Sequence, residues 1–226
     1  GDFVLDGEDV RELAIEALSR AAERVCMSAP HSSIEWYRAA VSVTPDGDAR
    51  HGELMARLAR ALFLAGQPRD AADVGRASLV RIAPGDARQR LTNLVIEALI
   101  EISASQEASE LIDLGIGSGL RYTAQSAHIL ALIGRLDDAR RAAEQVLHEL
   151  DQGTTTDQVI SLVHLAHMRC VESNYGALPP ILDRLSAVAA GAPAPAQLSA
   201  HMALGYILAW IGEPARSGES IARTQE

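Results

Sequence analysis

Residues 32–46 read Ser-Ser-Ile-Glu-Trp-Tyr-Arg-Ala-Ala-Val-Ser-Val-Thr-Pro-Asp, and this stretch decides the fold. Its apolar side chains recur at the three- and four-residue spacing of one helical face: Ile34, Tyr37, Ala40 and Val41. Ser32 and Glu35 match a capping box, which places the start of the helix there, and Pro45 is expected to end it. The stretch therefore predicts an amphipathic helix that buries one face against a neighbour.

The same order of helix, tight break and second helix returns along the chain. In residues 54–84, a first helix is followed by a Gly-Gln-Pro break at 66–68 and by a second helix over 69–82. One equivalent position can be marked in six second helices: Ser33, Ala71, Ala108, Ala139, Leu178 and Ser217. The spacings are 38, 37, 31, 39 and 39 residues. This period predicts a solenoid of about six helix pairs, and no alternating β-branched run competes with it.

A resemblance to a known repeat sharpens this prediction. The run Ile34-Glu35-Trp36-Tyr37, followed by Ala40-Val41 and Pro45, resembles the second helix of a tetratricopeptide repeat. We therefore expect an all-α, tetratricopeptide-like right-handed superhelix from Asp9 to the C-terminus, with residues 1–226 forming one domain. Short Pro- and Gly-rich breaks at 45–48, 151–153 and 191–195 are expected to be turns between repeats. The missing initiator methionine and a last helix with nothing stacked over it suggest a fragment of a longer chain, which could self-associate through that end.

A narrower resemblance suggests a biological setting. Residues 17–24, 36–40 and 58–66, together with Ala29-Pro30, are similar to the repeat region of large ATP-binding LuxR-family transcriptional regulators of actinobacteria, which are built like the maltose-regulon activator. The resemblance implies a sensor region that receives an effector or partner and controls ATPase and DNA-binding modules elsewhere in the chain. Neither module is present in this sequence, so no catalytic or DNA-reading residue is carried over. The alternative is a free-standing repeat adaptor that binds a peptide or a partner protein.

Composition excludes several classes of function. All 20 basic residues are arginine, so a Walker A lysine and a Schiff-base lysine are ruled out. The net charge of −10, without an arginine cluster, disfavours direct binding to nucleic acid or an anionic membrane. No apolar run approaches the length of a membrane span. Cys26 and Cys170 lie far apart and are expected to be reduced thiols of a cytoplasmic protein.

One glycine-rich stretch offers an enzymatic alternative. Residues 113–119, Asp-Leu-Gly-Ile-Gly-Ser-Gly, match the first loop of S-adenosylmethionine-dependent methyltransferases. That loop must follow a buried strand, but residues 107–112 are acidic and short, and no later strands are indicated. We therefore expect a turn between repeats, in which a glycine supplies a left-handed helix end.

Metal and catalytic sites are not indicated either. His164, His167 and Cys170 follow one another at three-residue steps on one helix, but the turn angles place Cys170 about 120° from His164. The paired carboxylates Asp137 and Asp138 are expected at a helix N-terminus, where the helix dipole stabilises them. The sequence thus predicts no enzyme, no cofactor and no metal.

A ligand groove is the favoured site. In a helical-hairpin solenoid the first helix of each pair lines the concave surface, and we infer one inward position per repeat: Ala22, Arg60, Glu97, His128, His167 and Tyr206. One turn later come Val25, Phe63, Ile100, Ala131, Cys170 and Ala209, with Trp210 adjacent. The predicted binding residues are Arg60, Phe63, Glu97, His128, His167, Tyr206 and Trp210. Mixed aromatic and polar groups suit a small organic effector or a peptide, and the two histidines would make binding sensitive to pH.

Overall fold

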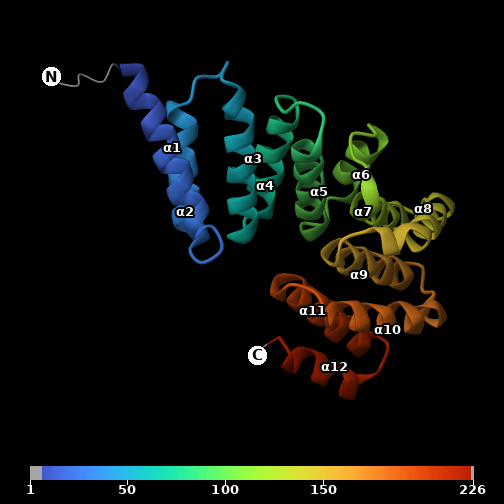
Figure 1. Ribbon diagram of the computed structural model, residues 1–226. Helices are drawn as coiled ribbons and strands as arrows, with labels where there is room; N and C mark the ends of the chain where they lie inside the picture. Colours follow the sequence, from blue (N-terminus) through green and yellow to red (C-terminus); the bar gives the residue numbers. More distant parts are fainter. Residues whose placement is uncertain (1–6, 225–226) are drawn as a thin grey trace. The chain divides into compact units, whose positions relative to one another are not determined.

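The structure, a computed structural model, describes residues 7–224 as a chain of helices (Figure 1). Those residues form twelve α-helices and two short 3-10 helices, with no strand, which confirms the all-α prediction. The first six are α1 Gly7–Val25, α2 Pro30–Val43, α3 Ala49–Leu64, α4 Pro68–Leu79, α5 Asp86–Glu101 and α6 Ser105–Asp113. The others are α7 Gly119–Leu132, α8 Leu136–Glu149, α9 Thr155–Val171, α10 Leu178–Ala189, α11 Ala194–Trp210 and α12 Pro214–Ala222, with η1 Leu150–Gln152 and η2 Tyr175–Ala177.

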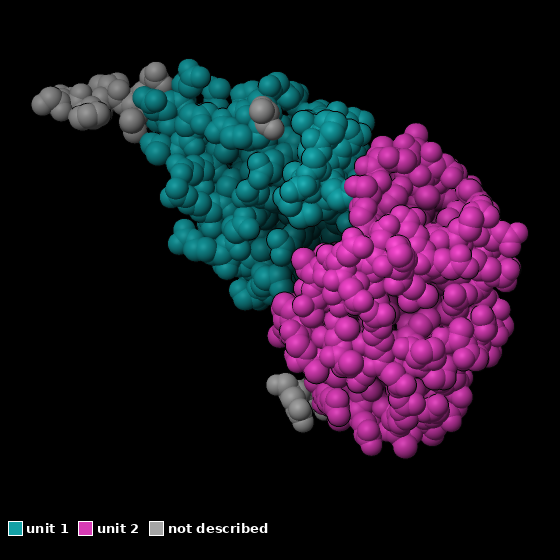
Figure 2. All heavy atoms as spheres, turned by 45° about the vertical axis from the view of Figure 1, so that its right-hand side comes forward, with its two compact units in different colours: residues 1–104 teal, residues 105–226 magenta. Residues whose placement is uncertain are grey.

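The chain forms two compact units, residues 1–104 and 105–226 (Figure 2). In the first, α1 packs on α2, α2 on α3, α3 on α4 and α4 on α5. In the second, the first helices α7, α9 and α11 pack side by side, while α8, α10 and α12 each pack on the helix that precedes them (Figure 1). The arrangement of each unit is that of stacked helix pairs, and a single domain over the whole chain stays a prediction.

The six repeated positions of the second helices are buried. Ser33, Ala71, Ala108, Ala139 and Leu178 have no exposed surface, and Ser217 retains 5%. The two serines show what the position does. The Ser33 hydroxyl donates to the backbone carbonyl of Ala22 on α1 over 3.0 Å, and the Ser217 hydroxyl donates to that of Gly205 on α11 over 2.8 Å. The repeat read from the sequence therefore marks the points where paired helices approach most closely.

Five first helices end in the same backbone motif. In α7, Gly134 N–H donates to the Ala131 carbonyl and Arg135 N–H to the Leu130 carbonyl, the Schellman pattern. The motif needs one residue in the left-handed region. That residue is Gly66 (φ 73°), Ser103 (57°), Gly134 (83°), Ser173 (57°) and Gly212 (84°) in α3, α5, α7, α9 and α11. Two repeats thus hold a serine in a conformation that favours glycine.

Two starts and one end differ from the sequence prediction. The capping box was wrong, because α2 begins at Pro30, whose ring fixes a helical φ, and its N-cap Ala29 makes no side-chain bond. Helix α1 begins at Gly7 rather than Asp9, and α4 ends at Leu79 rather than residue 82. The expected effect of Pro45 is confirmed, since Thr44 before it is extended.

We predict that Ser173→Gly raises the free energy of unfolding by about 1 kcal/mol, because it removes the clash of a Cβ in the left-handed region. Gly134→Ser, the reverse change at the matching position of α7, is expected to lower it by a similar amount. Urea unfolding followed by circular dichroism measures both. Ser186→Gly, inside the exposed face of α10, is the control and should destabilise. A loss of stability in Ser173→Gly would contradict the assignment.

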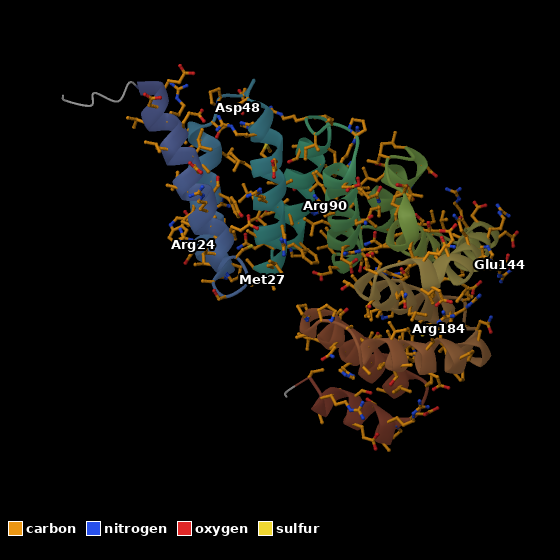
Figure 3. The ribbon with its side chains drawn as sticks, in the orientation of Figure 1. Arg24, Met27, Asp48, Arg90, Glu144 and Arg184 are labelled. Atoms are coloured by element: carbon orange, nitrogen blue, oxygen red, sulfur yellow. The ribbon has the colours of Figure 1, made fainter. Side chains whose placement is uncertain are left out.

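Asp48 caps the start of α3 (Figure 3). Its carboxylate accepts the backbone N–H of Arg50 over 2.8 Å and the Nε–H of the same residue over 3.0 Å. The Arg50 guanidinium also donates to Glu12 on α1 over 2.7 Å, so the cap ties two helices together. These bonds from Arg50 lower the pKa of Asp48 to about 2.

Because this pKa is depressed, the stabilisation by Asp48 is present above about pH 4 and is lost as the pH falls towards 2. Asp48→Asn keeps a good capping side chain but has no charge to lose. We therefore expect the gap in unfolding free energy between the two proteins to shrink from pH 5 to pH 2, as measured by urea unfolding at each pH. Asp46→Asn, which changes a neighbouring carboxylate outside the helix, should leave the gap smaller at pH 5. A constant gap for Asp48→Asn would contradict the prediction.

Candidate functional site

A row of rings crosses the first helices of the second unit. His128 on α7, His167 on α9 and Tyr206 on α11 are each 39 residues apart in sequence. Their ring centroids lie 5.4 Å apart between the histidines and 6.4 Å apart between His167 and Tyr206. Trp210, one turn further along α11, contacts Tyr206 edge to face at 5.7 Å. The structure thus brings four of the seven sequence-predicted site residues into one continuous row.

The row continues inward to a residue that the groove prediction left out. His164 on α9 lies with its Nδ1 atom 3.3 Å from Nδ1 of His128. A contact between two imidazole nitrogens holds one proton, so one ring donates and the other accepts. His164 and His128 are 3% and 7% exposed, whereas Tyr206 and Trp210 are 59% and 55% exposed. The row therefore runs from the interior of the unit to its surface.

The second line of predicted groove residues needs a shift of one position. Ala131 and Cys170, expected one turn after His128 and His167, are buried, and burial raises the pKa of the Cys170 thiol. Side chains four residues on, rather than three, face solvent, as the helical angle favours. They are Leu132, Val171 and Trp210, and each is the last residue of its helix. An apolar edge thus borders the ring row.

The other three predicted site residues belong to the first unit. Arg60 is exposed and Phe63 half-buried on α3, and Glu97 is half-buried on α5. Ala22 was assigned wrongly: it is fully buried, because it is itself the closest-approach residue that accepts the Ser33 bond. One groove formed by both sets of residues stays a prediction.

The first unit also contains a hollow that the sequence did not reveal. Its volume is about 380 Å³, and it lies between α1 and α3 over Leu13, Ile15 and Leu54. Arg50 and Arg57, seven residues apart on α3, border it. Their guanidinium groups donate to Glu12 and Glu23 of α1, so a ligand here would have to displace existing ion pairs. The seven-residue arginine spacing is the signal that could have located it.

Catalytic alternatives find no support in the architecture. The glycine-rich stretch 113–119 joins α6 to α7, and no strand precedes it in the described residues. Gly115, with φ 60°, donates its N–H to the Ile112 carbonyl and ends α6, as the turn interpretation predicted. Asp137 and Asp138 lie in the first turn of α8, as expected. Within residues 7–224, no three His, Cys, Asp or Glu side chains are grouped to hold a metal ion. No helix of that range is long and apolar enough to cross a membrane.

Known proteins of similar structure have the same repeat. The chain superposes on the crystal structure of the nearly identical TPR-like repeats of a putative kinesin light chain from Podosopora anserina, and on that of a variant of the same repeats with one residue substituted. The TM-scores are 0.59 and 0.61, at 16% sequence identity, over 78% of this chain and 95% of the other. No family model and no curated protein matches the sequence. The tetratricopeptide-like fold expected from the repeat is therefore confirmed.

Proposed function

We propose that this chain is a tetratricopeptide-like repeat module that binds a segment of a partner protein on the face of α7, α9 and α11. The observation that carries the proposal is the ring row from His128 to Trp210, with its apolar edge. Helix α11 adds Leu198 and Met202, which are 45% and 60% exposed. Exposed apolar residues that are contiguous, rather than scattered, mark interaction sites.

The residue types at this face suit a binding surface. Tyrosine and tryptophan supply large contact areas at a small cost in side-chain entropy and dominate binding energies when they are buried by a partner. Helix α11 contains no Asp, Glu or Arg in 17 residues, so a partner desolvates no full charge on it. Neighbouring first helices pack directly together here, which gives the surface a rigid base.

The finer proposal places this module in a LuxR-type signalling-ATPase regulator, as its sensor and protein-interaction region. Its support is the resemblance of residues 17–24 and 58–66 to that repeat region. There the bound partner or effector would control the ATPase and DNA-binding modules of the same chain. The reading frame around the chain discriminates this from an adaptor, because a regulator requires a P-loop upstream and a helix-turn-helix downstream.

We predict that Tyr206→Ala and Trp210→Ala each weaken partner binding by roughly 2 kcal/mol or more, because each removes a central aromatic anchor. The probes are peptides selected from a random library against the full chain, and the measurement is isothermal calorimetry. Arg60→Ala is expected to weaken binding only if the groove extends to α3. Circular dichroism should show unchanged helix content in all three variants.

Tyr175→Ala is the matched control, since Tyr175 is 43% exposed on η2 and outside the ring row. It should leave affinity unchanged. If every selected peptide binds Tyr206→Ala and Trp210→Ala as tightly as the parent chain, the face of α7, α9 and α11 is not the binding surface.

A further inference from the structure

We infer that the Tyr206–Trp210 pair receives a cationic side chain, arginine or lysine, from the partner segment. This inference rests on the proposed function and specifies the chemistry of the partner. The two rings are arranged edge to face at 73°, and both are more than half exposed. An edge-to-face contact occupies at most one face of one ring, so aromatic faces stay open to a ligand. Those faces carry negative electrostatic potential and attract cations, tryptophan most strongly.

The chain does not cover these rings with a cation of its own. In the described part of the chain, the ring partners of Tyr206 are His167 and Trp210, and no arginine stacks on either Tyr206 or Trp210. The next charged residue along the chain is Glu213, which accepts a bond from Arg216 over 2.8 Å. Arg216 also pairs with Asp183, so its guanidinium is held on the α12 side.

The electrostatic surroundings favour a positive ligand. Helices α7, α9 and α11 end at Leu132, Val171 and Trp210, so three carbonyl ends, each the negative pole of a helix dipole, lie along the apolar edge. Residues 105–226 contain 14 acidic residues against eight arginines, a formal charge of −6, which steers basic segments towards the unit.

Two arginines close to this edge in sequence are already neutralised. Arg135 pairs with Asp113 and Asp138, both over 2.9 Å. Arg169 pairs with Glu172 over 2.8 Å, and the side chain of Glu172 is almost fully buried. Because both guanidinium groups have carboxylate partners, they repel an incoming cation only weakly.

The flanking residues define the rest of the partner segment. Met202 and Val171 are apolar and exposed beside the rings. They suit the methylene stem of an arginine or lysine and an adjacent apolar side chain. The partner is therefore a protein segment in which a basic residue neighbours apolar ones, and an acidic segment is disfavoured.

A double-mutant cycle tests this inference on the full chain. The first change is Trp210→Leu, which keeps apolar bulk and removes the aromatic face. The second replaces the arginine of a selected peptide by citrulline, which keeps its shape and removes its charge. Calorimetry on the four combinations gives the coupling between ring and charge. We expect each single change to weaken binding about 2- to 30-fold, and the double change to cost little more than either alone.

The controls separate the possible failures. Trp210→Phe and Tyr206→Phe keep an aromatic face and should retain most of the affinity, whereas Tyr206→Leu should lose it. If Trp210→Leu weakens binding equally for the arginine and citrulline peptides, the face is a binding surface but the cation assignment is wrong. Selected peptides without basic residues would have the same meaning. If the parent chain self-associates and Trp210→Leu abolishes this, a second copy occupies the face and the inference is also overturned.

Discussion

Paired helices in this chain approach each other at a single kind of contact, and the arrangement of each unit depends on it. A small residue of the second helix lies against the backbone of the first, as in the bond from Ser33 to the Ala22 carbonyl. The same contact returns at the other end of the chain, between Ser217 and Gly205. At Gly205 even a Cβ would approach Ile221 to 2.7 Å, so the space there admits only hydrogen. Small side chains let the backbones come close, and the larger leucines then fill the layer around them.

That spacing also determines where the ring row lies. The three pairs of the second unit repeat every 39 residues, at the close contact, at the ring position and at the left-handed residue that ends the first helix. Because the period is constant, His128, His167 and Tyr206 occupy the same angular position on α7, α9 and α11. Their contact follows from the direct packing of these helices. The first unit differs, since its repeats are 38 and 37 residues apart and a hollow separates α1 from α3.

Much of this architecture could be predicted from the sequence, because small buried residues and glycine breaks are local signals. The helix pairs, the closest-approach positions and the row from His128 to Trp210 were all marked by period alone. The start of α2 was missed because Pro30 and the Ser32–Glu35 pair are both plausible signals, and sequence gives no means of ranking them. His164 was missed because its contact with His128 depends on side-chain rotamers across two helices. The α1–α3 hollow was missed because it arises from the separation of two helices, a quantity that no residue pattern encodes.

The left-handed helix ends have a consequence for how such a chain can grow. In α7, α9 and α11 the same residue step ends the helix and reverses the chain, whether glycine or serine occupies it. Each 39-residue block therefore carries its own contact point, its own ring and its own reversal. Duplication of one block would lengthen the ring row by one side chain and leave the geometry of its neighbours intact. The extent of the binding face is in this sense a count of repeats, and selection can adjust it by copying a segment without redesigning a surface.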